Sequence, residues 1–266
     1  MRVATFNLHA GVDGWGRPTR VLEHVAALDA DVLVLPELWR GEDGHDYYEE
    51  LRDRLSLDGA FAPLASGVRV TTGTGGRTWQ PLLAHITGEH GLYFDEHRSL
   101  TKAQRSRRGE LDAPEHGQWG LGLLTRLAIE DVRVETLDRL PREKVRRAFI
   151  VARLDDAGRS FYVIAVHGAH LSHGSHLQYR RITEFVESLD PAVPILLAGD
   201  FNCWRPLLRA LLPGWRSMVR ARTWPARTPH SQIDHVLARG PWTSLGGFAS
   251  DGGSDHRALV ADVVLG

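Results

Sequence analysis

The sequence contains a single cysteine, Cys203, among its 266 residues, so no disulfide can form within the chain. Lysine is also scarce: Lys102 and Lys144 are the only two. The 32 Lys and Arg residues are balanced by 33 Asp and Glu residues, and this near-neutral charge excludes a strongly basic nucleic-acid coat or an acidic tail as the organising feature. An apolar content of 42% with eight tryptophans argues against a disordered chain.

Long apolar runs are missing too. No stretch approaches the roughly 20 residues of a membrane-spanning helix, and no signal peptide is visible at the N-terminus. We therefore expect a cytoplasmic protein without a transmembrane segment, and the lone cysteine fits a reducing compartment. The sequence shows no internal repeat or low-complexity linker, which favours one domain over residues 1–266. It does not predict the oligomeric state.

Short apolar runs alternate with helical stripes along the chain. Residues 3–7 and 31–37 read as strands, and a helical stripe from Pro18 to Leu28 lies between them. This strand–helix–strand order predicts an α/β architecture. Residues 65–119, where Gly and Thr cluster, are expected to form loops and short strands. Further strands are expected at 122–126, 129–134, 148–154, 161–166, 194–200, 233–239 and 258–265, and further helices at 47–57 and 176–189.

Several apolar runs end in a carboxylate, an amide or a histidine. In α/β sheets, groups that project from strand ends converge on one rim, where ligands bind. Oxygen-bearing side chains at such a rim suit a hard divalent cation such as Mg²⁺ or Mn²⁺. Each residue alone has an ordinary explanation, such as a solvated carboxylate or an Asx turn, but their joint occurrence favours a site. The residues are Asn7, Glu37, His170, Asp200, Asn202, Asp234, Asp255 and His256.

The segments TFN, PE, HL, GDFN, IDH and SDH occur in this order along the chain. With the segment WGLGLLTR from Trp119, they resemble the endonuclease/exonuclease/phosphatase superfamily, which includes deoxyribonuclease I. The resemblance spans Thr5 to about Val263. It implies a four-layer α/β sandwich, in which two mostly antiparallel β-sheets pack face to face and are flanked by helices.

The resemblance also implies roles for residues that would hold the metal and the water. Glu37 corresponds to the main metal carboxylate, with Asn7 beside it and Asp255 as a further ligand. Asp200 and Asn202 correspond to the pair that orients or deprotonates the attacking water and holds a phosphate oxygen. The implied cofactor is Mg²⁺ or Mn²⁺.

Other residues correspond to the groups that surround the phosphate. His256 resembles the histidine that contacts the scissile phosphate, and Asp234 resembles its carboxylate partner. His170 occupies the second phosphate-binding position. Some family members pair that histidine with a glutamate from the middle of the chain, and here the candidates are Glu89, Glu96, Glu110 and Glu115. His235 follows Asp234, where relatives often have an aromatic residue.

The predicted function is a metal-dependent phosphoric ester hydrolase. The resemblance implies hydrolysis of phosphodiester bonds by in-line attack of an activated water, in a nuclease or a small-diester hydrolase. The partner is then a phosphate-ester substrate, nucleic acid among the candidates. Two alternatives stay open: an inositol-phosphate or phospholipid-headgroup phosphatase, and a non-catalytic phosphate-binding module that retains the fold.

A zinc site is a further alternative, because histidines recur at positions 167, 170, 173 and 176. The first two fall on a strand running into a loop, so the interval does not place all four on one helical face. The chain also has no cysteine pair and no HExxH motif. Substrate contacts are open as well: a basic segment (Lys102, Arg105, Arg107 and Arg108) and five tryptophans (Trp15, Trp39, Trp79, Trp119 and Trp204) lie near the motifs.

Overall fold

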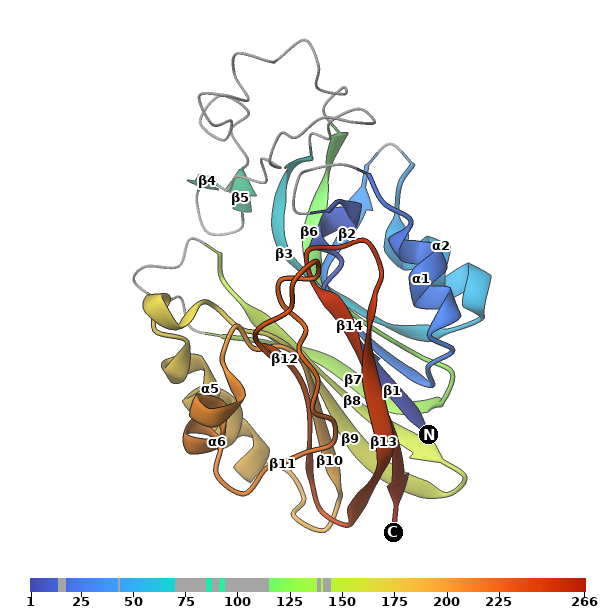
Figure 1. The fold of residues 1–266 in the computed structure, drawn as a ribbon, viewed down its shortest axis with the longest axis vertical. Helices are drawn as coiled ribbons and strands as arrows, with labels where there is room; N and C mark the ends of the chain where they lie inside the picture. Colours follow the sequence, from blue (N-terminus) through green and yellow to red (C-terminus); the bar gives the residue numbers. More distant parts are fainter. Residues whose placement is uncertain are drawn as a thin grey trace.

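The computed structural model of the chain describes residues 1–13, 18–42, 44–69, 85–87, 91–93, 115–137, 140 and 145–266. Within these ranges, no helix is long and apolar enough to cross a membrane. Two six-stranded sheets pack face to face, with helices on their outer sides (Figure 1). The predicted four-layer α/β sandwich is therefore confirmed.

The first sheet contains the N- and C-terminal strands and has the order β13-β14-β1-β2-β6-β3. Its pairs are antiparallel except β1 and β2, which run parallel and are joined through α1 (Val21–Ala27). Apolar side chains of α1 and α2 (Tyr47–Leu55) pack on its outer face. The strands are β13 (Trp242–Asp251), β14 (Arg257–Leu265), β1 (Arg2–Thr5), β2 (Val32–Gly41), β6 (Glu115–Thr125) and β3 (Asp58–Arg69).

The second sheet has the order β11-β12-β10-β9-β8-β7. Here β9 and β10 are the parallel pair, joined through the short η3 (Leu171–His173) and α5 (Ser175–Glu187). Apolar side chains of α5 and α6 (Arg205–Leu211) pack on its outer face. The strands are β11 (Arg216–Ser217), β12 (Asp234–Arg239), β10 (Ile195–Asp200), β9 (Arg159–His167), β8 (Ala148–Asp156) and β7 (Ala128–Thr136). A separate hairpin, β4 (His85–Thr87) and β5 (Gly91–Tyr93), and the short η1 (His9–Gly11) complete the described elements.

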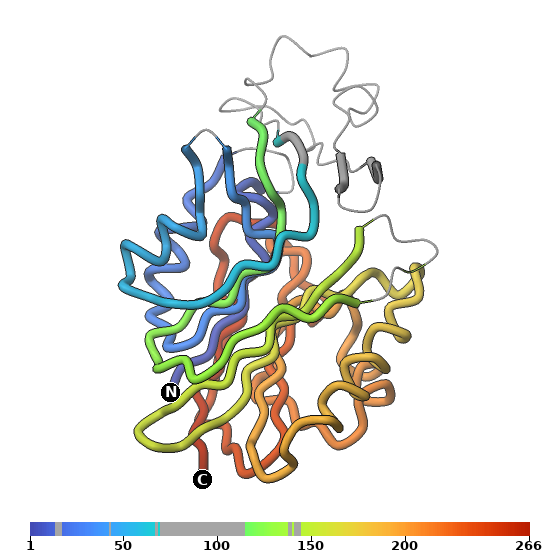
Figure 2. The backbone as a smooth tube through the Cα atoms, turned by 180° about the vertical axis from the view of Figure 1, so that it is seen from behind, coloured from blue at the N-terminus to red at the C-terminus, as the bar shows by residue number. Residues whose placement is uncertain are grey.

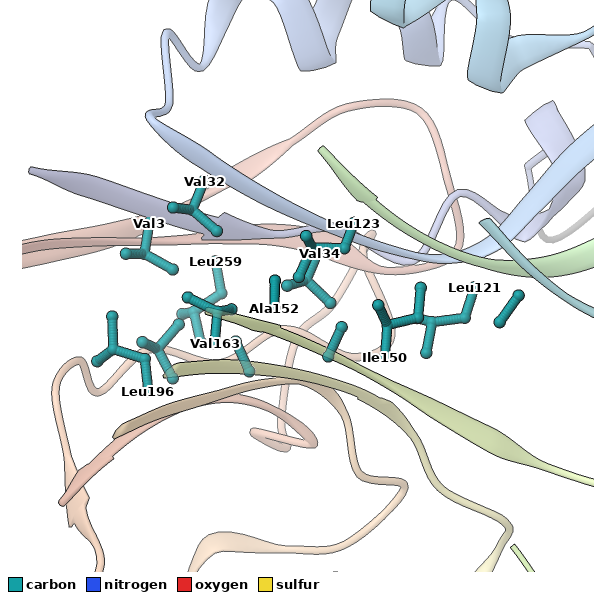
Figure 3. Close-up of a cluster of buried hydrophobic side chains, with 14 of the residues drawn as sticks. Val3, Val32, Val34, Leu121, Leu123, Ile150, Ala152, Val163, Leu196 and Leu259 are labelled. Carbon is teal, nitrogen blue, oxygen red and sulfur yellow. The ribbon is translucent and has the colours of Figure 1, made fainter. Parts of the chain in front are cut away.

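The main core lies between the two sheets. Side chains of Val34 and Leu121 from the first sheet point toward Ile150 and Val163 from the second (Figure 3), and all four are fully buried. Full burial of a large apolar side chain stabilises the folded state by about 1.5–3 kcal/mol. The packing fixes the two sheets against each other and so fixes the relative positions of residues at their edges.

Strand β3 and the first part of β6 were not expected from the sequence, whereas the end of β6 matches the strand expected at 122–126. Residues 65–119 were expected to form loops and short strands, yet β3 continues to Arg69 and β6 begins at Glu115. Aromatic rings cover two of the glycines in β6: a Cβ atom on Gly117 would lie 2.7 Å from the Trp39 ring, and one on Gly120 would lie 2.5 Å from the Phe61 ring. These glycines therefore make room for rings on neighbouring strands. Strand β13 and helix α6 were also missed.

Both chain termini lie at the same end of the sandwich, as the view from behind shows (Figure 2). This follows from the antiparallel pairing of Arg2 with Asp262, which places the start of β1 beside the end of β14. The opposite end of these strands, where β1 stops and β14 begins, is the edge that carries the predicted site residues.

Candidate active site

The predicted site residues gather at this edge of the two sheets. In the first sheet, Asn7 follows β1 and His256 immediately precedes β14. In the second sheet, Asp200 ends β10 and lies in register with Asp234, the first residue of β12, and with His167, the last residue of β9. Because the sheets are packed face to face, these strand ends form one group.

The Asn7 amide connects the two sheets within this group. Its Nδ2 donates to Glu37 Oε1 and to Asp200 Oδ2, both at 3.0 Å. Its Oδ1 accepts the backbone N–H of His9 at 3.0 Å. The side chain is 1% exposed, so both carboxylates are held by a buried and fully oriented amide.

Glu37 is presented by a β-bulge. The pairing of β2 with β6 shifts register between Pro36 and Leu38, and Glu37 is the inserted residue, with a φ of 55°. A left-handed conformation costs a non-glycine residue about 1–3 kcal/mol and is concentrated at functional sites. The bulge turns the Glu37 side chain to the sheet edge, where Trp119 Nε1 lies 3.4 Å from Oε2 and the side chain keeps 19% of its exposure.

Asp200 is the most deeply placed carboxylate of the group. It is 1% exposed, and its Oδ1 accepts the backbone N–H of Asn202 at 2.8 Å. Asn202 itself adopts a left-handed conformation, and its Nδ2 lies 3.1 Å from the Gly168 carbonyl and 3.3 Å from Asp200 Oδ2. Burial and the neighbouring Asp234 raise the pKa of Asp200 to about 7, against lowering by His256 and the hydrogen bonds.

His256 and Asp234 form a buried pair. Asp234 Oδ2 lies 2.9 Å from His256 Nδ1, and the residues are 0% and 5% exposed. Burial alone would lower the pKa of His256, but Asp234, Asp200 and Asp255 together hold it well above its usual value. The raised pKa favours the imidazolium form of His256, whose Nε2 faces Asp200 Oδ2 at 3.9 Å.

His167 is held in the opposite state. Its Nδ1 lies 3.0 Å from Arg147 Nη1, and a guanidinium only donates, so Nδ1 is the acceptor and the proton sits on Nε2. Burial first, then the charges of Arg147, His256 and His170, keep the pKa of His167 well below its usual value. The neutral ring directs Nε2–H toward Glu37 Oε1 at 3.7 Å and Asp200 Oδ2 at 3.8 Å.

From the sequence, His170 was the histidine expected in this neighbourhood; His167 was considered only for the zinc alternative, and Arg147 was not considered. His170 is exposed and its ring packs against His173, with 5.7 Å between the ring centroids. The sequence did contain a signal for His167, because it ends an apolar strand as Asp200 does. Arg147 directly precedes β8, and its guanidinium packs 5.2 Å above the Trp119 ring.

A cleft of about 480 Å³ opens onto this group. Two exposed tryptophans line it, Trp204 with 60% and Trp224 with 37% of the side chain exposed. His9 and Asp255 also line it, and His9 Nδ1 lies 3.5 Å from Asp255 Oδ1. Burial tends to raise the pKa of Asp255, but His9, His256 and Ser254 lower it overall. The cleft residues are His9, Glu37, Arg147, His167, His170, Leu171, Ser172, Asp200, Asn202, Trp204, Trp224, Ile233, Asp255 and His256.

The donor set fits a hard divalent cation. Glu37 offers a partly exposed carboxylate beside Asp200, and such oxygen ligands suit Mg²⁺ or Mn²⁺ better than Zn²⁺. In the described residues, Asp200, Asp234 and His256 also have ligand atoms within 4.8 Å of one another. That group is already tied by the buried Asp234–His256 hydrogen bond, whereas the Glu37 carboxylate faces the cleft.

The zinc alternative and the candidate partners of His170 can be compared with the described residues. The four histidines of the zinc alternative do not come together: His167 is buried at the end of β9, whereas His176 is exposed in α5. Glu115 bonds Trp39 and Arg69, not a site histidine. The other candidate glutamates, the basic segment and two of the tryptophans lie outside the described residues: Glu89, Glu96, Glu110, Lys102, Arg105, Arg107, Arg108, Trp15 and Trp79.

Comparison with known proteins identifies a matching family and similar sequences. A model of the Endonuclease/Exonuclease/phosphatase family matches residues 4–256, a range that includes every site residue above. The uncharacterized protein YbhP of Escherichia coli strain K12 is 22% identical over 301 residues, which cover 99% of this chain and 96% of that protein.

Solved structures share the fold at low sequence identity. The endonuclease/exonuclease/phosphatase from Beutenbergia cavernae DSM 12333 has a TM-score of 0.66 and 19% identity, covering 100% of this chain and 72% of that one. The mannosyl-6-phosphatase Bt3783 of Bacteroides thetaiotaomicron VPI-5482 has a TM-score of 0.64 and 14% identity, covering 99% of both chains.

Proposed function

The chain belongs to the endonuclease/exonuclease/phosphatase family, and on that premise we propose that it is a divalent-metal-dependent phosphoesterase that hydrolyses phosphodiester bonds by in-line attack of an activated water. The observation that carries the proposal is the position of one carboxylate between two histidines. Asp200 Oδ2 lies 3.8 Å from His167 Nε2 and 3.9 Å from His256 Nε2, and Glu37 Oε1 lies 3.7 Å from His167. A phosphoryl group in the cleft meets a base, two N–H donors and a metal-binding carboxylate.

Asp200 is the residue that we assign to the attacking water. A pKa of about 7 lets its carboxylate accept a proton from water near neutral pH. The backbone N–H of Asn202 and the Nδ2 of Asn7 hold the two carboxylate oxygens in place. Such fixed orientation is what a positioned base requires.

The two histidines act as donors of different charge. His256, an imidazolium paired with Asp234, donates a charged N–H to a phosphoryl oxygen and stabilises the charge that develops there. His167, neutral and held by Arg147, donates Nε2–H without adding a second charge next to His256. We therefore assign the second phosphate-binding role to His167 and place His170 at the rim of the cleft.

Glu37 is proposed to hold the cation, with Asn7 and Asp255 as the further ligands. When bound, a divalent cation offsets negative charge on a phosphoryl oxygen. The chain's own contribution is orientation, since the bulge directs Glu37 toward the cleft and Asn7 ties it to Asp200. The strained, left-handed backbone at Glu37 is then explained by its role in directing the carboxylate toward the cation.

The cleft favours a substrate with a flat or apolar group next to its phosphate. Trp204 and Trp224 offer exposed indole faces, and Leu171 and Ile233 lie beside them. Stacking on such faces accommodates bases without sequence selection, so a single-stranded nucleic acid or a small nucleotide-like diester is the substrate class we favour. A net charge of -1 supports a small or single-stranded substrate over a long duplex.

A phosphatase acting on monoesters is the second candidate. The buried Arg147 guanidinium lines the cleft and would match the extra negative charge of a phosphomonoester. The fold is also shared with a protein whose name is mannosyl-6-phosphatase. The inositol-phosphate and phospholipid-headgroup substrates belong to this class.

The test compares three substrates: bis(para-nitrophenyl) phosphate, para-nitrophenyl phosphate and single-stranded DNA. Each is assayed with Mg²⁺ or Mn²⁺, with EDTA, and with the variants His256→Ala and His45→Ala. His45 is an exposed histidine on a loop outside the cleft and serves as the matched control. We expect metal-dependent cleavage of the diester, lost with EDTA and reduced about 10²–10⁴-fold in His256→Ala.

Preference for the monoester would replace the diesterase assignment with the phosphatase. A folded, Mn²⁺-binding protein that turns over no substrate would favour the non-catalytic binding module. Activity that persists in EDTA and in His256→Ala would contradict the proposed chemistry altogether.

A further inference from the structure

A second cavity, of about 260 Å³, lies away from the cleft on the outer side of the second sheet. It is formed by α6, by the segment around β11 and by β12, all three labelled in Figure 1. Its floor is apolar and buried, and four arginines and a histidine surround it. The cavity residues are Arg205, Leu208, Arg209, Leu212, Trp215, Arg216, Ser217, Arg220, His235 and Leu237.

The charge of this cavity is not balanced. Its lining contains no carboxylate, and within the described parts of the chain no ion pair involves Arg205, Arg209, Arg216 or Arg220. Arg216 uses Nη2 to bind the carbonyls of Gly240 and Trp242. Four guanidinium groups around one small cavity create a positive potential that an anion would neutralise.

His235 supplies a second, independent observation. The residue is 0% exposed, and its Nε2 lies 3.0 Å from the Cys203 carbonyl oxygen. Because a carbonyl only accepts, Nε2 carries the proton and Nδ1 keeps a lone pair. Nδ1 is buried, and among the described residues it has no hydrogen-bond partner. Burial, against the Cys203 carbonyl and Asp234, lowers the pKa of His235 to about 4, so the ring stays neutral at pH 7.

A cavity lined by one buried acceptor and by arginine donors selects a specific kind of anion. The arginines can donate to the unprotonated oxygens of an anion, but His235 Nδ1 needs a partner that donates a proton. A phosphate group with one O–H meets both requirements. A sulfate ion and a backbone phosphodiester carry no O–H at neutral pH and leave Nδ1 unsatisfied.

We propose that this cavity binds a singly protonated phosphoryl group, either inorganic phosphate or a terminal phosphomonoester. Its volume is just below the range of pockets for drug-sized ligands, which suits a phosphoryl group with little attached to it. The site stands apart from the cleft, and the proposal does not depend on the catalytic activity.

The cavity is nevertheless connected to the cleft through the chain. Asn202 and Trp204 line the cleft, whereas Arg205, the residue after Trp204, lines the cavity, so one short segment of the chain borders both. Cys203, whose carbonyl holds His235, lies between them. Free phosphate in the cavity would therefore contact the segment that positions Asn202 and could change its conformation. A terminal phosphate on a longer substrate would instead add binding energy outside the cleft.

Phosphate binding to the full chain provides the first test. Inorganic phosphate and sulfate are titrated calorimetrically into EDTA-treated protein at pH 7, in a His256→Ala background that weakens binding of either anion in the cleft. The double variant Arg209→Gln/Arg220→Gln changes two exposed arginines of the cavity, and Arg54→Gln changes an exposed arginine in α2 as the control.

We expect the double variant to raise the phosphate dissociation constant at least about tenfold, the loss of one charge-assisted contact or more, and Arg54→Gln to leave it unchanged. Phosphate should bind more tightly than sulfate, and His235→Phe, which keeps an aromatic ring, should abolish that preference. Unchanged phosphate affinity in the double variant would overturn the site. Equal affinity for sulfate and phosphate in the parent protein would overturn the requirement for a proton.

Two kinetic comparisons identify the source of the phosphate in the active protein. If free phosphate is the ligand, added phosphate changes diester hydrolysis in the parent protein and not in the double variant. If the substrate supplies it, a 5′-phosphorylated oligonucleotide is cleaved faster than its 5′-hydroxyl counterpart, and only in the parent protein. Phosphate binding without any hydrolysis would refute the proposed enzyme and leave the cavity site standing.

Discussion

Replacement of Asp234 by asparagine tests what the negative charge of Asp234 contributes to the buried Asp234–His256 pair. Asp234 Oδ2 lies 2.9 Å from His256 Nδ1, and asparagine keeps a side chain of the same size without the negative charge. His256 then loses the nearest of the carboxylates that hold its pKa well above the usual value. Asp200 at 3.9 Å and the adjacent Asp255 remain, so part of the effect survives.

The size of the loss follows from these contacts. A positioned acid or base contributes about 10²–10⁴ in rate, and because two carboxylates remain, we expect kcat/KM to fall by about 10², or about 2.7 kcal/mol of transition-state stabilisation. Breaking a buried ion pair also lowers the free energy of unfolding by about 3–5 kcal/mol. The pKa of His256 falls, so the decline of activity at high pH moves to lower pH.

The sign of the pH effect on stability is fixed by the raised pKa of His256. The pair stabilises the folded state fully below the pKa of an unfolded histidine, near 6.5, and this contribution is lost as the pH rises through the higher folded value. Urea unfolding of the parent protein should therefore show stability falling across that window, and Asp234→Asn should flatten the curve.

The assay is kcat/KM on bis(para-nitrophenyl) phosphate with Mn²⁺ as a function of pH, with Asp262→Asn as the control. Asp262 is a partly exposed carboxylate that pairs with Arg2 at the other end of the sheet. If Asp234→Asn kept a third or more of the activity with its high-pH decline unmoved, the assignment of His256 as a charged donor would be refuted.

Three further predictions concern other contacts. Arg147→Met removes the donor that fixes the His167 tautomer, and we expect kcat to fall about tenfold or more with little change in KM. ¹⁵N NMR of this variant should show the His167 proton shared between Nδ1 and Nε2. A single Nε2–H form in the variant would contradict the role of Arg147 in fixing the tautomer. Gly199→Ala would place a Cβ 1.9 Å from the Val166 carbonyl oxygen at a φ of 145°, so we expect loss of at least about 1–3 kcal/mol of stability in urea unfolding; an unchanged midpoint would show that the strands adjust. Ile150→Ala opens a cavity between the sheets and should cost about 2–5 kcal/mol, whereas a loss under 1 kcal/mol would mean that the core closes around it.

The sequence predicted the positions of the site carboxylates because apolar runs mark where buried strands end. Asp200 directly follows five apolar or small residues of β10, and Glu37 lies in the apolar run of β2. The same rule found Asn7 after β1. Strand ends on one rim then brought these residues together without any knowledge of the topology.

The same rule does not separate His167 from His170, because it fixes a strand end only to within a few residues. The run that ends β9 continues as His-Gly-Ala-His, and both histidines fit the end of an apolar strand. Only the pairing of His167 with Asp200 across β9 and β10 decides between them. Arg147 was missed for a related reason, since its burial depends on Trp119, which is distant in sequence.

Strand β3 and the first part of β6 were missed because glycine and proline usually interrupt strands, whereas the end of β6 matches the strand expected at 122–126. Here Gly117 and Gly120 lie under aromatic rings of neighbouring strands, so the missing side chains are replaced by Trp39 and Phe61 from the adjacent strands. Such compensation between strands cannot be read from one segment at a time. Strand β13 was missed because most of its side chains are exposed and give no apolar pattern.

The hydrogen bonds of Asn7 have a consequence for how the protein would lose its activity. Asn7 and Glu37 belong to the first sheet and Asp200 to the second, and a single amide spans the gap between them. The proposed catalytic group therefore exists only while the two sheets are docked. Any partly folded form in which each sheet survives but the interface opens would be catalytically silent, so hydrolysis during unfolding would report the separation of the sheets rather than the loss of their strands.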